Sequence, residues 1–240
     1  MWDNHRRLNQ VATGLYVTAA LLLVYWALTA IARLPIFPLR EIQVTGRIAH
    51  TTSDQVRAVI DGRLQGNFFT LDLEVARVSL QRLPWVRHVL LRREWPDRLE
   101  VQIEEHVALA RWRENALVNS YGEVFEAATN EALPVFNAPD GTAGEVTRRY
   151  LMFTGLLEPL GKHPVQVLLS ERRAWQVRLD DGTVLELGRG ETGQIEEKLR
   201  RLAAVYPRAL ERLSGWPQRI DLRYSNGFAI HNGVRHTPGA

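Results

Sequence analysis

The feature that most constrains the fold is an uncharged stretch that runs from Leu8 to Ala32. Roughly 20 apolar residues, at a helical rise of about 1.5 Å each, cross a bilayer core of about 30 Å. A cleaved signal peptide is the alternative, because the stretch ends in the sequence Ala-Ile-Ala. The apolar region of a signal peptide extends for only about 7–15 residues. We therefore predict a retained transmembrane helix over residues 8–32, preceded by a tail that is too short to fold.

The basic residues around this stretch do not decide its orientation. Arg6 and Arg7 precede it, and Arg33 and Arg40 follow it. The excess of Lys and Arg that marks the cytoplasmic side of a membrane helix is therefore missing from the pattern. Orientation has to come from other observations.

Residues 38–106 predict a small domain that begins with a strand and a helix. Residues 41–46 read E-I-Q-V-T-G, in which apolar and polar side chains alternate before a glycine, a pattern typical of a strand that ends in a turn. Thr52 and Gln55 then form a T-x-x-Q capping box. In such a box the threonine oxygen binds the amide of the glutamine, and the glutamine side chain returns to the amide of the threonine.

A second helix and a hairpin complete this domain. Asp72 can cap the second helix, and Pro84 ends it. Residues 89–104 alternate on both sides of Pro96, which predicts an antiparallel hairpin with one buried face. The resulting order, β-α-α-β-β, predicts the α+β class.

The remainder of the chain predicts a mainly antiparallel β domain with two helices. Gly122 marks the turn of one hairpin, and Asp-Asp-Gly at 180–182 marks another between two alternating runs. Apolar stripes at helical spacing predict helices over 146–160 and 195–206. The expected boundaries are a tail over 1–7, a membrane helix over 8–32, a linker over 33–37, a first domain over 38–106, a β domain over 107–231 and a tail over 232–240.

The sequence G-R-G-E-T-G at 188–193 fits the fingerprint of dinucleotide-binding proteins, G-x-G-x-x-G. That fingerprint requires parallel βαβ units and an acidic residue about 20 residues further on. Here the preceding strand is predicted to belong to an antiparallel hairpin, position 213 is leucine, and Glu191 would lie beside the pyrophosphate. We therefore predict that the glycines form a turn, that Glu191 or Thr192 caps the next helix, and that no nucleotide or other cofactor binds.

No other set of residues has the spacing of a catalytic or metal site. The chain has no cysteine, its 7 histidines form no H-E-x-x-H motif, and it has no G-x-S-x-G motif. Glu104 and Glu105 are adjacent in a predicted strand, so their side chains point to opposite faces and do not form an acid/base pair. The net charge of +3, with acids and arginines interleaved, is not the one-signed stripe of a nucleic-acid-binding protein. We predict that the protein is not an enzyme.

Short motifs occur in a fixed order from the apolar stretch to about residue 230. They read L-P-W-V-R at 83–87, R-R-E-W-P-D-R-L-E-V at 92–101, E-E-H at 104–106, A-R-W at 110–112, L-V-N at 117–119, G-E-V-F at 122–125, L-P at 133–134, E-R-R-A-W at 171–175, L-G-R at 187–189 and D-L-R-Y at 221–224. Together they resemble the FtsQ/DivIB family of bacterial cell-division proteins. One departure is that Val107 or Ala108 stands where many members have proline.

This resemblance implies a cytoplasmic N-terminus, a single span of the inner membrane, and periplasmic domains at the division septum. The first domain would be a POTRA (polypeptide-transport-associated) domain, in agreement with the β-α-α-β-β order. Members of the family are not enzymes, and they bind FtsB and, with it, FtsL. Another POTRA-bearing envelope protein, for assembly or transport, is the alternative. A barrel in the outer membrane is disfavoured because it would need many alternating segments of about 10 residues.

The expected partner-binding site is the last predicted strand, from Arg223 to His231. A terminal edge strand presents unpaired N–H and C=O groups to which an extended partner can add. Tyr224 is expected to be an aromatic anchor and Arg223 to pair with a partner carboxylate, and the resemblance implies FtsB binding near this strand. The alternatives are that Tyr224 and Phe228 only pack the core, or that the preceding helix covers the edge. The predicted binding residues are Arg223, Tyr224, Ser225, Asn226, Gly227, Phe228 and Ile230.

Two tryptophans, Trp95 and Trp112, lie in or beside predicted strands. Large aromatic side chains stabilise a protein chiefly by burial. Both are therefore predicted to be structural, and truncation of either to alanine is predicted to cost about 3 kcal/mol or more.

Overall fold

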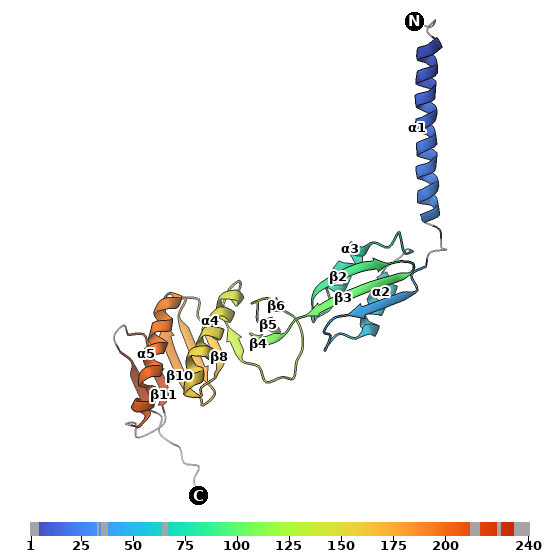
Figure 1. Cartoon of the computed structure of the whole chain (residues 1–240). Coiled ribbons are helices and arrows are strands. Elements are labelled where there is room, and N and C mark those ends of the chain that lie inside the picture. The colour runs from blue at the N-terminus through green and yellow to red at the C-terminus, as the bar shows by residue number, and fades with distance from the viewer. Residues whose placement is uncertain are drawn as a thin grey trace. The chain divides into compact units, whose positions relative to one another are not determined.

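The computed structural model describes residues 5–32, 34, 38–63, 67–211, 217–224 and 227–232 (Figure 1). The chain divides into two compact units, Met1–Glu105 and His106–Ala240. Helix α1 (His5–Ala32) opens the first unit, and its segment Asn9–Ala32 is long and apolar enough to cross a membrane. None of that segment is buried inside the protein, as expected of a helix whose surroundings are lipid. The predicted helix over 8–32 is therefore confirmed as a helix.

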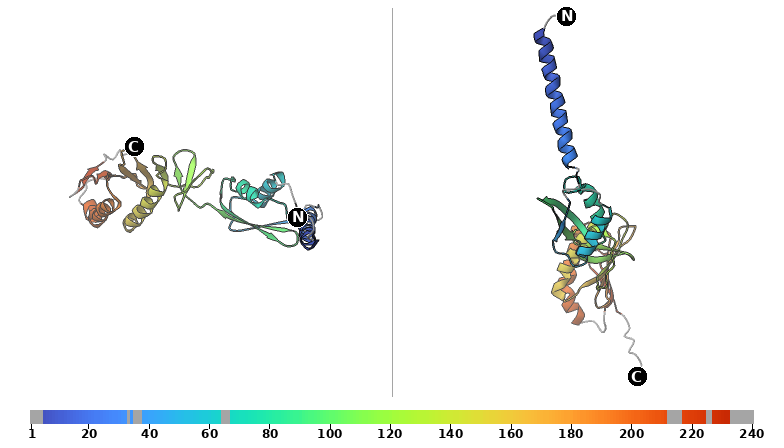
Figure 2. Two further views of the ribbon diagram at one scale, coloured as in Figure 1. Left: turned by 90° about the horizontal axis from the view of Figure 1, so that it is seen from above. Right: turned by 90° about the vertical axis from the view of Figure 1, so that its right-hand side faces the viewer.

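The rest of the first unit is a three-stranded sheet with two helices. Its elements are β1 (Glu41–Thr45), α2 (Ser53–Arg63), α3 (Leu73–Leu80), β2 (Val86–Glu94) and β3 (Arg98–Glu105). β3 is the central strand; it is parallel to β1 and antiparallel to β2. Leu99, Val101 and Ile103 of β3 are almost completely buried in one cluster with residues of both helices, which lie on one face of the sheet (Figure 2). The predicted β-α-α-β-β order is confirmed.

Helices α2 and α3 both begin at the predicted caps. The backbone N–H of Gln55 donates to Oγ1 of Thr52 at 3.2 Å, and the N–H of Thr52 donates to Oε1 of Gln55 at 3.0 Å. These two hydrogen bonds form the reciprocal capping box. The carboxylate of Asp72 accepts the N–H groups of Glu74 and Val75 at the start of α3.

The second unit contains a nine-stranded sheet and two long helices. Its elements are β4 (Ala108–Trp112), β5 (Ala116–Asn119), β6 (Val124–Phe125), β7 (Val135–Asn137), α4 (Ala143–Leu157), η1 (Glu158–Leu160), β8 (Pro164–Leu169), β9 (Trp175–Leu179), β10 (Val184–Gly188), α5 (Thr192–Glu211), β11 (Pro217–Asp221) and β12 (Ala229–Asn232). The strand order is β12-β11-β10-β9-β8-β7-β4-β5-β6. The pairs β4–β7, β7–β8 and β10–β11 are parallel, and the other neighbours are antiparallel.

The core of the second unit lies between the sheet and its helices. α4 and α5 lie side by side on the same face of the sheet (Figure 2). Phe136 of β7 and Phe153 of α4 are fully buried, and the ring of Phe153 meets the ring of Trp175 edge to face at 6.1 Å. The hairpins predicted at Gly122 and at 180–182 are confirmed, with positive φ at Gly122 and Gly182 where only a residue without a Cβ is unstrained.

The predicted last strand is wrong in its extent. β11 ends at Asp221, the described residues 222–224 and 227–228 of the connection to β12 are not in a strand, and strand pairing resumes at Ala229. The reason is local: the N–H of Arg223 donates to Oδ1 of Asp221 at 2.9 Å. This side-chain contact two residues apart turns the backbone away from the ladder.

The predicted absence of a βαβ unit at 188–193 is also wrong in part. β10 is antiparallel to β9, as the Asp-Asp-Gly turn predicted, but its other edge is parallel to β11, with α5 as the crossover. A hairpin occupies only one edge of a strand. The alternating pattern and the Asp-Asp-Gly turn therefore contain no information on which strand pairs with the other edge of β10. The chain's own side chains contact the glycine turn: a Cβ on Gly188 would lie 2.9 Å from Cγ of Arg223, and the carbonyl of Gly190 accepts Nη2 of Arg149 at 3.1 Å.

The two tryptophans differ in their exposure to solvent. Trp112 is 5% exposed, which agrees with a structural role, but Trp95 is 81% exposed and the prediction for it is wrong. The ladder between β2 and β3 ends at the pair Glu94–Arg98, and Trp95 lies in the turn beyond it. A side chain in that turn has no neighbouring strand on which to pack.

Candidate partner-binding edge

Strand β12 is the last strand of the nine-stranded sheet. It pairs with β11 on one side, and no strand in the described part of the chain pairs with its other side. Ile230 lies opposite Ile220 and packs, partly buried, against the core, whereas the neighbouring His231 is exposed. Among the described residues, the outer edge of β12 is therefore open to pairing with another strand.

A groove of about 240 Å³ lies beside the connection that leads into β12. Its walls are Lys198, Arg201, Ala204 and Val205 of α5, and Leu222, Tyr224, Gly227 and Phe228 of the connection. Tyr224 is 61% exposed and Val205 is 46% exposed, so apolar surface faces solvent here. A partner segment that follows β12 would meet this groove at once, because Phe228 directly precedes the strand.

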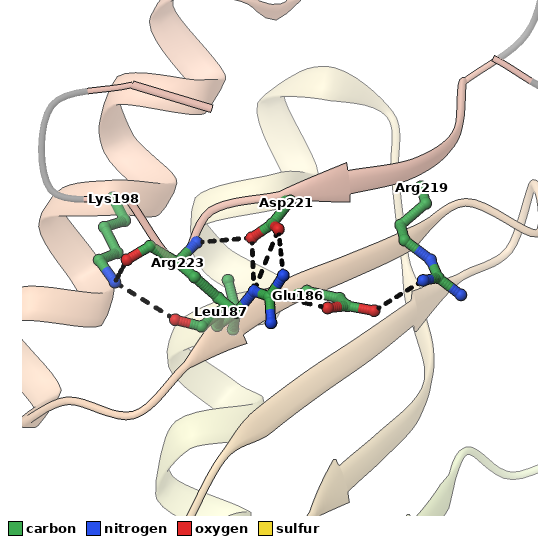
Figure 3. Close-up of polar contacts among 6 residues, drawn as sticks. All are labelled: Glu186, Leu187, Lys198, Arg219, Asp221 and Arg223. Carbon is green, nitrogen blue, oxygen red and sulfur yellow. Dashed lines mark hydrogen bonds and ion pairs between the residues drawn. The ribbon is translucent and has the colours of Figure 1, made fainter. Parts of the chain in front are cut away.

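An ionic cluster holds the connection in place (Figure 3). The Nε of Arg223 donates to Oδ1 of Asp221 at 2.9 Å, and its Nη2 donates to Oδ2 at 2.6 Å. Glu186 of β10 lies between two arginines, 3.3 Å from Nη1 of Arg219 and 3.8 Å from Nε of Arg223. The hydrogen bond from Arg223 holds the pKa of the Asp221 carboxyl below its ordinary value although its side chain is 7% exposed, and Asp221 in turn raises the pKa of Arg223.

This cluster brings together two motifs that are far apart in the sequence, L-G-R at 187–189 and D-L-R-Y at 221–224. The Nζ of Lys198 donates to the carbonyl of Leu187 at 3.3 Å and to the carbonyl of Arg223 at 3.4 Å (Figure 3). The stem of Arg223 lies against Gly188, where a Cβ would be too close. Arg223 is thus both a structural residue, through Asp221, and a surface cation, because 60% of its side chain is exposed.

The structure brings most of the predicted residues to one place. Arg223, Tyr224, Gly227 and Phe228 belong to the connection, and Ile230 belongs to β12. Ser225 and Asn226 lie outside the described residues. Phe228 is partly buried and packs against the core. The side chain of Tyr224, in contrast, is 61% exposed.

The sequence suggested the helix over 191–206 only as a possible cover for the edge and did not predict that α5 lines the groove. Lys198, Arg201 and Val205 all line the groove, and the buried residues Ile195, Leu199 and Leu202 face the core. The positions 198, 201 and 205 are spaced by one helical turn and share a side of the helix next to the core stripe. The helical spacing of these three positions is visible in the sequence. Nothing in the sequence, however, indicated that this side of α5 lies next to Leu222, Tyr224 and Phe228.

Comparison with known proteins agrees with the order of the motifs. The family profile described as "POTRA domain, FtsQ-type" matches residues 37–106. The profile described as "Cell division protein FtsQ/DivIB, C-terminal" matches residues 110–223. The two matched segments contain both the β-α-α-β-β sheet and most of the nine-stranded sheet, up to the cluster at Arg223.

Several curated proteins are similar over almost the full chain, and each carries the name "Cell division protein FtsQ". The protein from Nitrosospira multiformis is 43% identical over 95% of this chain and 98% of its own length. The protein from Burkholderia pseudomallei is 42% identical over 96% of this chain and 94% of its own length. The protein from Bordetella pertussis is 35% identical over 96% of this chain and 92% of its own length. The chain belongs to the FtsQ/DivIB family of bacterial cell-division proteins.

Proposed function

We propose that the protein is a single-pass scaffold of the division complex in the bacterial inner membrane. In this proposal residues 1–7 are cytoplasmic, 8–32 cross the membrane, and the domains over 38–106 and 107–231 lie in the periplasm at the septum. The scaffold links early cytoplasmic to late periplasmic division proteins by binding and catalyses no reaction. The apolar, unburied helix α1 and the membership of a cell-division family support this role.

The proposed partner is FtsB, and with it FtsL, bound at the outer edge of β12. The observation that carries this proposal is an open strand edge directly next to a groove with an exposed tyrosine. A strand from the partner would satisfy the outer N–H and C=O groups of β12, and its neighbouring segment would cover Tyr224 and Val205. Arg223, already held by Asp221, offers a partner carboxylate a pre-positioned cation, which lowers the entropy lost on binding.

Site-specific crosslinking in cells tests the edge. The chain has no cysteine, so a single introduced thiol is unambiguous. We expect His231→Cys, in the exposed part of β12, to form a disulfide with cysteines scanned along the periplasmic part of FtsB, with a maximum at alternate positions because strand side chains alternate. Tyr121→Cys, 68% exposed near β6 at the opposite end of the sheet, is the control. Equal crosslinking from both positions would contradict strand addition at β12.

Affinity measurements test the aromatic anchor. Tyr224→Ala in the detergent-solubilised full chain is expected to weaken FtsB binding at least tenfold, whereas Tyr121→Ala is expected to leave it unchanged. Tyr224 and Tyr121 are similarly exposed, at 61% and 68%, so both substitutions remove a tyrosine side chain of similar exposure from the surface. Charge reversal at Arg223 is a poorer test, because it also leaves the buried Asp221 without its cation. Unaltered affinity of Tyr224→Ala would show that the site lies elsewhere.

The membrane topology has its own test. In spheroplasts, an external protease is expected to digest the part of the chain after residue 32 and to leave α1 with the membrane. A mature protein that starts at Arg33 would show that the apolar segment is a cleaved signal peptide. Protection of the C-terminal part would reverse the proposed orientation.

A further inference from the structure

Trp95 is more exposed than any other large hydrophobic side chain that the structure describes, including those of α1. Its exposed fraction is 81%, against 77% for Tyr16 in the apolar helix. An indole ring is large and mostly apolar but carries one N–H donor, so it is poorly placed in bulk water and well placed at the boundary between lipid and water. Its exposure in the turn of a well-packed hairpin leaves the indole ring accessible to a partner outside the domain.

Hydrogen bonds connect this turn to the end of the apolar helix. The side-chain amide of Asn67 donates to the carbonyl of Ala32, the last residue of α1, at 2.7 Å and to the carbonyl of Leu34 at 2.8 Å. Asn67 begins a short loop that ends at Leu71, because the N–H of Leu71 donates to the carbonyl of Asn67 at 2.9 Å.

The carbonyl of Leu71 in turn accepts Nη2 of Arg93 at 2.5 Å, and Arg93 is two residues before Trp95 on the same strand end. On the other side of the turn, the carbonyl of Asp97 accepts the N–H of Arg40, which lies between the apolar helix and β1. The Trp95 turn therefore belongs to the end of the domain that contacts the helix terminus. Phe69, 47% exposed in the loop between Asn67 and Leu71, lies at this same end.

We infer that Trp95, supported by Phe69, inserts into the headgroup layer of the membrane that α1 crosses. The occupant of this exposed surface is phospholipid, because the hydrogen bond from Asn67 to Ala32 holds this end of the domain at the residue where the membrane helix ends. The nearby charges do not require an anionic lipid: Arg98 pairs with Glu41 at 2.9 Å, and Arg40 lies 3.9 Å from Asp97. The contact would hold the POTRA-type domain against the bilayer.

This inference depends on α1 crossing a membrane and not on the binding of FtsB. It can therefore be tested with the full chain alone in vesicles of phosphatidylcholine, some of which carries a spin-label quencher on its headgroup. A polarity-sensitive fluorophore on Glu94→Cys, next to Trp95, reports the turn. The same fluorophore on Leu90→Cys is the matched control, because Leu90 is exposed on the same face of β2, about 13 Å further along the strand.

We expect the lipid quencher to reduce emission at position 94 at least twofold more than at position 90. Trp95→Ser should remove this difference and Trp95→Tyr should restore it, while hydrogen exchange in β2 and β3 stays unchanged because the side chain is exposed. Equal quenching at both positions, or no effect of Trp95→Ser, would overturn the proposal. So would shielding of position 94 that appears only after other division proteins are added, since the occupant would then be a protein. Loss of the chain from floated vesicles would contradict the span and, with it, this proposal.

Discussion

Replacement of Glu105 by glutamine tests how the first unit holds the segment that leads into α2. Glu105 is the last residue of β3, and its side chain is 5% exposed. Its carboxylate accepts the backbone N–H groups of Ala49 at 2.8 Å, His50 at 3.1 Å and Thr51 at 2.6 Å. Glutamine has the same shape but loses the charge and turns one of the two acceptor oxygens into a donor.

The expected cost follows from these contacts. Hydrogen bonds to a charged group contribute about 1.5–3 kcal/mol each, and roughly half of the acceptor capacity is lost. Ala49 and His50 are themselves exposed, so water replaces part of what they lose. We therefore expect Glu105→Gln to destabilise the first unit by about 2 kcal/mol at pH 7.

The same reasoning fixes the pH dependence. Burial disfavours the charged form of Glu105, but the hydrogen bonds from Thr51, Ala49 and His50 outweigh it, so the pKa of Glu105 is lowered on folding. A lowered folded-state pKa stabilises the protein above the unfolded-state pKa, and this stabilisation is lost as the pH falls through the folded-state pKa. The difference between the parent and Glu105→Gln should therefore be largest at neutral pH and shrink at acidic pH.

Hydrogen–deuterium exchange at increasing urea concentration, read by mass spectrometry in peptides from β1 to β3, measures this unit separately from the second. Glu104→Gln is the matched control, because Glu104 is adjacent, 54% exposed, and pairs with Arg87 at 2.6 Å. The Arg87 side chain is only 15% exposed, but the Glu104 carboxylate lies mostly in solvent. A surface ion pair contributes about 0–1 kcal/mol, so this control should change less than Glu105→Gln. Equal effects of the two substitutions, or a Glu105→Gln effect that persists at low pH, would refute the reasoning.

Three further predictions concern the two tryptophans, Gly46 and nucleotide binding. Trp112→Ala should destabilise the second unit by about 3–5 kcal/mol, whereas Trp95→Ala should change the first by less than about 0.5 kcal/mol, as followed by the same exchange measurement. Gly46→Ala should abolish the exchange protection of the first unit, because the added Cβ would lie 2.1 Å from the carbonyl oxygen of Ile103. Calorimetry with NAD or ATP should show no binding; micromolar affinity that is lost in Gly190→Ala would contradict this.

The parts of the fold that depend on neighbours in the sequence were predictable. The apolar helix, the capping box at Thr52, the cap at Asp72 and the glycine turns at 122 and 182 each follow from residues within a few positions of one another. The β-α-α-β-β order follows from such local signals read in succession. The motifs quoted above were enough to indicate the family, since their order along the chain is itself information in the sequence.

The partner of each face and edge was decided only by the tertiary structure. The sequence did not show that β10 is parallel to β11, that β11 ends at Asp221, or that α5 lines the groove beside Tyr224. It also predicted a buried Trp95 that the turn exposes. The physical reason is that periodicity reports which side of an element is apolar, whereas the element that packs there is chosen by contacts between distant segments. A side chain in a turn, such as that of Trp95, lies outside any periodic pattern, so only the folded chain determines what it touches.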